Sequence, residues 1–119
     1  MSSSYISSLF SLDGKVAIIT GGTGGLGKAM TEGLAKAGAV IISIELPNDP
    51  NSAALADAVT AVGSSVKVFK CDVGNPKELR DCYKRIWESG VTPDILLNCA
   101  GVMRRDKCED ARDEDIDLV

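Results

Sequence analysis

Histidine is absent from this sequence of 119 residues, and other signals of specific chemistry are scarce. The four cysteines form no C-x-x-C pair, and without histidine beside them a zinc or other metal site is not expected. We interpret them as reduced thiols of a cytoplasmic protein. The net charge of -4 argues against a basic surface for nucleic acid or an anionic membrane. No apolar run reaches membrane-spanning length, and the first residues lack the pattern of a secretory leader.

Length and composition indicate one domain at most, since 45% of the 119 residues are apolar and can form a modest core. Residues 1–12 are rich in serine with scattered apolar side chains. We expect them to form an N-terminal arm whose first residues fray and whose later part packs on the domain. Residues 13–119 then form the domain itself.

Short apolar runs alternate with helical patterns along the domain. The predicted strands are residues 15–20, 39–45, 66–70 and 95–98. The predicted helices are residues 25–37, 53–62, 76–88 and 112–119. Such alternation implies right-handed crossovers. It predicts an α/β fold with a parallel, doubly wound Rossmann sheet in the strand order 3-2-1-4.

Two of the predicted helices have distinctive patterns. In the first, apolar side chains recur at three- and four-residue spacing and predict the buried side: Leu26, Met30, Leu34 and Ala37. The helix from Pro76 starts with Asn75 as its cap, and Glu78 is placed to accept from the Asn75 N–H. Its predicted buried side contains Leu79, Cys82 or Tyr83, Ile86 and Trp87.

A glycine-rich turn, Thr20 to Gly27, lies directly between the first predicted strand and the first predicted helix. Glycine allows a tight turn, a close approach to a pyrophosphate and close packing of the helix on the strand. The helix start adds backbone N–H groups and the positive end of its dipole. We therefore predict a dinucleotide site. Its candidate residues in the turn are Gly21, Thr23, Gly25, Leu26 and Gly27.

An acidic residue, Glu45, ends the second predicted strand, 18 positions after Gly27. A carboxylate at this place accepts hydrogen bonds from the adenosine ribose hydroxyls and repels a 2′-phosphate. No arginine lies in the turn or beside Glu45. The pattern therefore favours NAD over NADP, while a solvated strand end remains the alternative interpretation of Glu45.

Three segments in this order resemble the N-terminal half of the short-chain dehydrogenase/reductase family: the T-G-x-x-x-G-x-G turn at 20–27, Cys71-Asp72-Val73, and Asn98-Cys99-Ala100-Gly101. The resemblance implies a partial NAD(P)-binding Rossmann domain over residues 13–119. It implies that Leu26 and the neighbouring glycines meet the pyrophosphate. It also implies that two residues flank the adenine, Asp72 and Val73. Three more would line the path toward the nicotinamide ribose: Asn98, Ala100 and Gly101. Cys99 departs from the family's second asparagine.

Residues 100–105 and 113–119 are similar to the sugar-acid branch of that family, which includes 2-deoxy-D-gluconate 3-dehydrogenase and its 2-dehydro-3-deoxy-D-gluconate counterpart. Arg104 and Arg105 are candidates to hold a substrate carboxylate through charge-assisted hydrogen bonds. The alternative is a surface pair that balances the neighbouring acidic residues Asp106, Glu109 and Asp110.

The family's catalytic tyrosine, with a lysine four residues later, has no counterpart in this chain. Tyr5 is followed four positions later by Leu9, and Tyr83 by Trp87. No catalytic residue is therefore assigned. In a chain truncated in this way, residues 95–97 would form an exposed apolar edge strand that another strand or protein could pair with.

Two functions follow as hypotheses. The chain is the cofactor-binding half of an NAD-dependent oxidoreductase that acts on a hydroxyl or ketone, with a sugar acid as the candidate substrate once the missing half completes the site. Alternatively, it is a truncated, catalytically incomplete module that binds a nucleotide or another protein. A dinucleotide is the expected partner in both, and a homo-oligomer or an edge-strand partner stays open.

Overall fold

The computed structural model describes residues 3–101 and 107–118 of the chain. In chain order, the elements are α1 (Ser3–Phe10), β1 (Val16–Thr20), α2 (Gly25–Lys36), β2 (Val40–Glu45), α3 (Ser52–Ala61), β3 (Val66–Lys70), α4 (Pro76–Glu88), β4 (Ile95–Asn98), the 3-10 helix η1 (Cys108–Asp110) and α5 (Asp113–Leu118). The predicted strands and helices between residues 13 and 100 are all present, with ends within one residue of the prediction.

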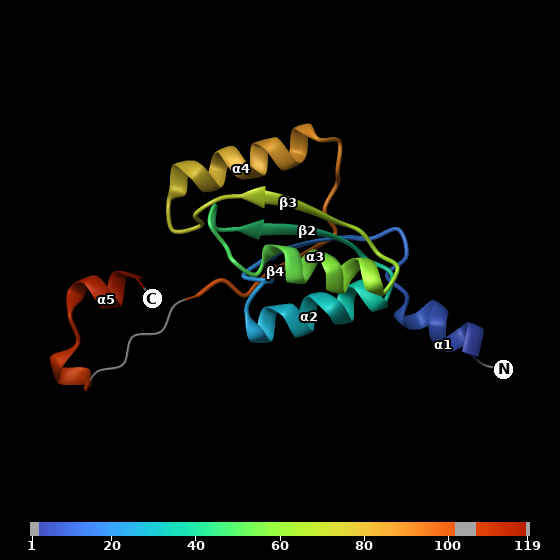
Figure 1. The fold of residues 1–119 in the computed structure, drawn as a ribbon, viewed down its shortest axis with the longest axis horizontal. Helices are drawn as coiled ribbons and strands as arrows, with labels where there is room; N and C mark the ends of the chain where they lie inside the picture. The colour runs from blue at the N-terminus through green and yellow to red at the C-terminus, as the bar shows by residue number, and fades with distance from the viewer. Residues whose placement is uncertain (1–2, 102–106, 119) are drawn as a thin grey trace.

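The four strands form one parallel sheet in the order β3-β2-β1-β4 (Figure 1), which confirms the predicted topology. Each strand of such a sheet connects to the next through a helix, so every strand ends at the same edge. Thr20 ends β1 and lies opposite Asn98 of β4, while Glu45 ends β2 and lies opposite Lys70 of β3. The loops that follow these four residues are therefore brought together.

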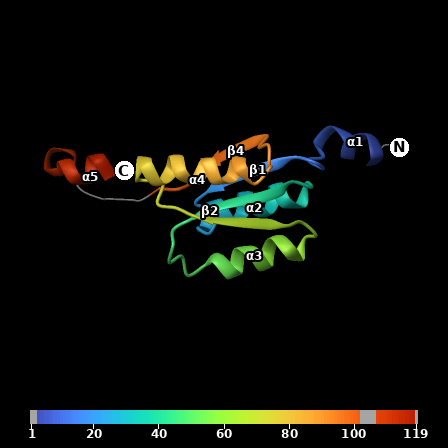
Figure 2. The ribbon, with the colours of Figure 1, turned by 90° about the horizontal axis from the view of Figure 1, so that it is seen from above.

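Helices cover both faces of the sheet, with α3 and α4 on opposite sides in Figure 2. Side chains alternate between the faces along each strand. One core cluster joins the first face to α2 and α3: Ala17, Ile19, Ala35, Ala39, Ile41, Leu55 and Val59. A second cluster joins the other face to α4: Ile18, Ile42, Ile44, Cys71, Cys82 and Ile86. Because both faces are covered, the central strands are apolar without alternation.

Helix α2 buries only part of the side that the sequence predicts. The sequence spacing predicts burial of Leu26, Met30, Leu34 and Ala37. Instead the helix buries Gly27, Thr31 and Ala35, while Leu26 is 73% exposed and Met30 is 41% exposed. Small side chains at this spacing let the helix axis come close to the sheet, and the Thr31 hydroxyl is satisfied by donating to the Gly27 carbonyl at 2.7 Å. The prediction was wrong for Leu26 and Met30, because close packing here requires small residues, whereas Leu34 is half-buried and packs against the first core cluster.

Helix α4 begins as predicted at an asparagine cap. The Asn75 side-chain oxygen accepts from the backbone N–H groups of Lys77 and Glu78, at 3.1 and 3.2 Å. The predicted partner of Glu78 is wrong, since its carboxylate accepts from the Asp72 N–H at 3.5 Å rather than from Asn75. Trp87 was also predicted to be buried but is 66% exposed.

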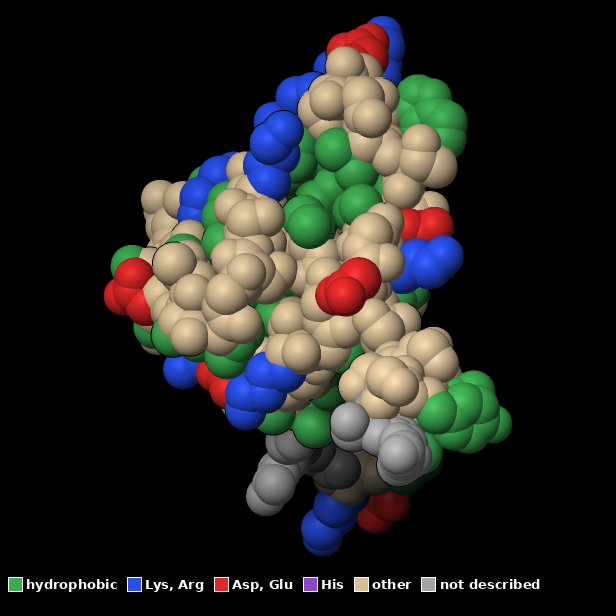
Figure 3. Space-filling model, turned by 90° about the vertical axis from the view of Figure 1, so that its right-hand side faces the viewer, with side chains coloured by type: hydrophobic (Ala, Val, Ile, Leu, Met, Phe, Trp, Pro, Cys, Tyr) green, Lys and Arg blue, Asp and Glu red, His purple; other side chains and the backbone are tan. Residues whose placement is uncertain are grey.

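The N-terminal residues form a helix that the sequence analysis did not predict. Helix α1 exposes four apolar side chains: Tyr5, Ile6, Leu9 and Phe10. Hydrophobic side chains appear at the surface in Figure 3, which views the molecule from the side on which α1 lies. Of the later part of the arm, Leu12 contacts the first core cluster and donates its N–H to the Ala37 carbonyl at 2.7 Å, whereas Leu9 and Phe10 are exposed.

Strand β4 is an edge strand of the sheet. Leu96 is 54% exposed, and Ile95 and Leu97 are half-buried. In the described part of the chain no further strand pairs with β4 besides β1. The predicted exposed apolar edge is therefore present.

Candidate functional site

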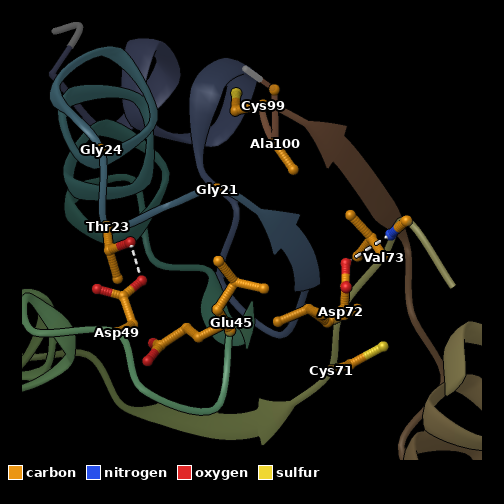
Figure 4. A pocket seen from close by; sticks show the side chains of 14 residues that line it. Gly21, Thr23, Gly24, Glu45, Asp49, Cys71, Asp72, Val73, Cys99 and Ala100 are labelled. Carbon is orange, nitrogen blue, oxygen red and sulfur yellow. Dashed lines mark hydrogen bonds between the residues drawn. The ribbon is translucent and has the colours of Figure 1, made fainter. Parts of the chain in front are cut away.

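A cavity of about 400 Å³ lies at the carboxyl ends of the strands (Figure 4). It is lined by Gly21, Thr23, Gly24, Ile44, Glu45, Leu46, Asp49, Cys71, Asp72, Val73, Gly74, Cys99, Ala100 and Gly101. These residues follow or end all four strands, so the sheet topology assembles the cavity from segments far apart in sequence. Open parallel sheets bind ligands in this position, where the strand order reverses.

The glycine turn is held tightly against its neighbours. Gly21 has a φ of 72°, and a Cβ placed on it would lie 2.5 Å from the Ala100 nitrogen. A Cβ on Gly27 would lie 2.0 Å from the Gly21 carbonyl oxygen. Gly25 differs, because a Cβ there would meet no atom within 4 Å. Gly21 and Gly27 are thus required by the protein's own packing, whereas the space beside Gly25 is open for a ligand.

Helix α2 starts beside this cavity without a side-chain cap. Its N-cap residue is Gly24, which lines the cavity and makes no side-chain hydrogen bond to the helix. In contrast, Asn75 caps α4 with two hydrogen bonds. The first N–H groups of a helix have no partner within the helix and carry partial positive charge. An uncapped start next to an open cavity suits an anion such as a pyrophosphate.

Glu45 is nearly fully buried, at 3% exposure, and both of its carboxylate oxygens accept hydrogen bonds. Oε2 accepts from the Ser43 hydroxyl at 2.7 Å, and Oε1 accepts from the Lys70 ammonium at 3.2 Å. Glu45 is therefore not a solvated strand end. The absence of arginine near Glu45 in the sequence did not reveal Lys70, although both residues end neighbouring predicted strands.

Further contacts connect the turn to the loop after β2. The Thr23 hydroxyl donates to the Asp49 carboxylate, and the two side chains point toward one another in Figure 4. Asp49 also accepts from the Asn51 N–H at 2.9 Å. Asp49 could not be identified as a site residue from the sequence, because its loop carries no motif.

Asp72 and Val73 line the side of the cavity that follows β3. The Asp72 carboxylate accepts from the Gly74 N–H at 2.9 Å, which closes a turn of its own. Val73 is half-buried and packs against the second core cluster. The acidic residues that line the cavity are therefore Glu45, Asp49 and Asp72, and the Glu45 side chain is 1% exposed.

The segment after β4 is bound to the end of β1. The Cys99 N–H donates to the Thr20 carbonyl at 2.9 Å, and the Ala100 N–H donates to the Thr20 hydroxyl at 3.3 Å. Cys99 therefore keeps the backbone pairing in this segment, and its thiol lies 3.6 Å from the Met30 sulfur. Asn98 is exposed at the end of β4 and does not line the cavity.

The structure brings most of the predicted site residues together. Those that line the cavity are Gly21, Thr23, Glu45, Asp72, Val73, Ala100 and Gly101. Those placed next to it in the turn, in α2 or in β4 but outside its lining are Gly25, Leu26, Gly27 and Asn98. Arg104 and Arg105 lie outside the described residues.

All four cysteines are free. Burial raises the pKa of the Cys71 thiol to about 11, with a smaller contribution from Cys82, so this cavity residue is a protonated, weakly reactive thiol. Within residues 3–101 and 107–118, no group of three side chains is arranged to hold a metal ion. In the same residues, no helix is long and apolar enough to cross a membrane.

Comparison with known proteins gives consistent relatives. A 2-dehydro-3-deoxy-D-gluconate 5-dehydrogenase of Pseudoalteromonas atlantica is 36% identical over 96 residues, covering 81% of this chain and 38% of that protein. A short-chain dehydrogenase/reductase structure from Serratia marcescens superposes with a TM-score of 0.79 at 32% identity, covering 89% of this chain and 43% of that one. A short chain dehydrogenase from Burkholderia cenocepacia in complex with NADP has a TM-score of 0.79 at 31% identity, and the match covers 90% of this chain and 44% of that one.

This chain spans about two fifths of the length of these relatives. The family model for short chain dehydrogenases matches residues 15–119, which include every strand of the sheet and the cavity at its edge. The chain belongs to the short-chain dehydrogenase family.

Proposed function

We propose that this chain is the cofactor-binding part of an NAD-dependent oxidoreductase that acts on a hydroxyl or ketone of a sugar acid. One observation carries the proposal: the glycine turn, the uncapped start of α2 and the Glu45 carboxylate all converge on one cavity of about 400 Å³. Each of these features matches a different part of a dinucleotide. The nicotinamide group would supply the chemistry of hydride transfer when bound.

The residues of the cavity divide by the part of the dinucleotide that they suit. Backbone N–H groups at the start of α2, together with the open space beside Gly25 next to the cavity, suit the pyrophosphate. Glu45 suits the adenosine ribose hydroxyls, because a carboxylate oxygen accepts more than one hydrogen bond. Asp72 and Val73 would flank the adenine. Ala100 and Gly101, fixed to the end of β1 through Thr20, would lie toward the nicotinamide ribose.

The preference for NAD over NADP rests on the charge of the cavity. The charged residues that line it are Glu45, Asp49 and Asp72, and all three are acidic. A 2′-phosphate adds close to two negative charges and would be repelled by them. We therefore expect NADH to bind more tightly than NADPH.

The sugar-acid substrate is supported by three curated relatives that are 2-dehydro-3-deoxy-D-gluconate 5-dehydrogenases, from Pseudoalteromonas atlantica, Bacillus subtilis and Formosa agariphila. Arg104 and Arg105 follow the segment that ends the cavity and remain the candidates for holding a substrate carboxylate. Four free cysteines fit a reducing compartment such as the cytoplasm.

A second function deserves a test, because the tyrosines of this chain are poorly placed for proton transfer. Tyr5 lies on α1, and Tyr83 is half-buried on α4, where burial raises its pKa. Neither lines the cavity, and neither has a lysine four positions later. The alternative is therefore a binding module without redox activity, and the exposed outer edge of β4 would be its docking surface.

Calorimetric titration of the purified full chain with NADH and with NADPH tests the proposal. The expected result is binding of both dinucleotides with a lower Kd for NADH. Equal affinities would remove the NAD preference, and no binding of either would remove the cofactor-binding function. Turnover assays of this chain with NAD and 2-deoxy-gluconate or related sugar acids are expected to show no activity, because no residue of the chain is assigned the proton transfer. Measurable NAD-dependent turnover would overturn that expectation.

A further inference from the structure

We propose that Lys70 is a specificity-determining residue of this cofactor site and limits the discrimination between NAD and NADP that Glu45 would impose alone. The inference rests on the proposed function. It starts from a contact that the family motifs do not include: the Lys70 ammonium lies 3.2 Å from Glu45 Oε1. The two residues are the last of neighbouring strands and lie opposite one another in register.

The two partners differ strongly in exposure. The Glu45 side chain is 1% exposed, whereas the Lys70 side chain is 41% exposed. The carboxylate is thus held inside the fold by Ser43 and Lys70, and the ammonium reaches it from the solvent side. Arg85, another cation near the end of β3, is a different case, because it donates to the Lys70 carbonyl at 3.2 Å and stacks over Phe69.

This ion pair does not prevent Glu45 from binding a ribose. A carboxylate has about four acceptor positions on its two oxygens. Ser43 and Lys70 occupy one position on each oxygen, so each oxygen retains one acceptor position. Because the side chain is 1% exposed, a ribose hydroxyl would reach that position only after the carboxylate turns toward the cavity that Glu45 lines. Lys70 therefore also fixes the orientation in which the carboxylate is presented, without removing its ability to accept.

A 2′-phosphate experiences the pair differently from a hydroxyl. Any group bound at Glu45 Oε1 lies within about 6 Å of the Lys70 ammonium, given ordinary hydrogen-bond lengths. The ammonium balances the Glu45 charge and attracts a phosphate, while Asp49 and Asp72 continue to repel it. Lys70 should therefore raise the affinity for NADPH much more than the affinity for NADH.

A purely structural role for Lys70 makes a different prediction. If the lysine only compensates the buried charge of Glu45, removing it would disturb the carboxylate and weaken the binding of both dinucleotides by the same factor. The ratio of the two dissociation constants separates the roles, because a general loss of structure leaves that ratio unchanged.

The experiment measures Kd for NADH and NADPH by calorimetry at low ionic strength in the full chain and in Lys70→Met. We expect the ratio of Kd for NADPH to Kd for NADH to rise about tenfold or more, mainly through weaker NADPH binding. Lys84→Met is the matched control, since it removes the same charge from an exposed pair with Glu88 and should leave the ratio unchanged. If Lys70→Met does not fold, Lys70→Gln replaces it, because glutamine can still donate a hydrogen bond to Glu45. Lys70→Gln should also raise the ratio of Kd for NADPH to Kd for NADH.

If Lys70→Met or Lys70→Gln leaves the ratio of the two dissociation constants unchanged, or weakens the binding of both dinucleotides by the same factor, the proposed role of Lys70 is overturned. The cofactor-binding function would remain intact. If the unmodified chain binds neither dinucleotide, the proposed function fails, and the inference fails with it.

Discussion

Replacing Gly27 by alanine tests how the turn and α2 are packed, and Gly33 provides a matched control in the same helix. A Cβ on Gly27 would lie 2.0 Å from the Gly21 carbonyl oxygen, whereas a Cβ on Gly33 would meet no atom within 4 Å. The better helix propensity of alanine should raise the free energy of unfolding by about 0.5–1 kcal/mol in both variants. Only Gly27→Ala forces atoms apart.

The turn has little freedom to relieve that contact. Gly21 is itself in the left-handed region, at a φ of 72°, and its own position for a Cβ is 2.5 Å from the Ala100 nitrogen. Moving the Gly21 carbonyl therefore disturbs the pairing between the ends of β1 and β4. Overpacking of this kind costs about 1–3 kcal/mol. We expect Gly33→Ala to be more stable than the unmodified chain by up to about 1 kcal/mol and Gly27→Ala to be less stable by about 1–2 kcal/mol.

Urea unfolding followed by circular dichroism measures this difference. With an m value of about 1–3 kcal/mol/M, the midpoints of the two variants should differ by roughly 1–2 M. Calorimetry should also show weaker NADH binding for Gly27→Ala, because the displaced turn borders the cavity, and no change for Gly33→Ala. Equal midpoints for the two variants would refute the packing argument.

Two further predictions concern α4 and the thiols. Asn75→Ala should reduce the free energy of unfolding by about 1 kcal/mol, because the N–H groups of Lys77 and Glu78 lose their acceptor. Asn51→Ala should have a smaller effect, since Asn51 makes no side-chain cap bond. Equal urea midpoints for the two variants would contradict this prediction. The pKa of the Cys71 thiol is raised from 9.0 to about 11 in the folded chain. Between pH 9 and pH 11 the unfolded chain therefore loses a proton that the folded chain retains, so the free energy of unfolding should fall as the pH rises. Urea midpoints measured across this pH range test the prediction. The midpoint should decline less steeply for Cys71→Ser than for the unmodified chain, and as steeply for Cys108→Ser. A midpoint that stays constant or rises with pH in the unmodified chain would refute the prediction.

The strands and their order could be predicted because their signals are local. Continuous apolar runs mark strands that are covered on both faces, and glycines mark the ends of the helices between them. Gly38, Gly63 and Gly90 all follow helices and have positive φ values of 112°, 87° and 84°. The order of the strands then follows from the dinucleotide-binding fold that the glycine turn and the alternation of strands and helices indicate.

Predictions about helix faces were less accurate because burial depends on the partner surface. Apolar spacing placed Leu26 and Met30 in the core, yet the helix approaches the sheet through Gly27, Thr31 and Ala35. A pattern of large apolar residues identifies a helix, but it does not reveal where a neighbour requires small ones. Trp87 illustrates the same limit on α4.

For the site, sequence motifs identify the turn, Glu45 and the segment after β4, because backbone geometry and charge at these positions follow from residue type and order. The partners of those residues come from elsewhere in the chain: Lys70 and Ser43 on Glu45, Asp49 on Thr23, and Thr20 on Ala100. These contacts arise because a parallel sheet brings the carboxyl ends of all its strands to one edge. Local chain chemistry thus decides which groups are available for a dinucleotide, and only the folded sheet decides which charges surround them.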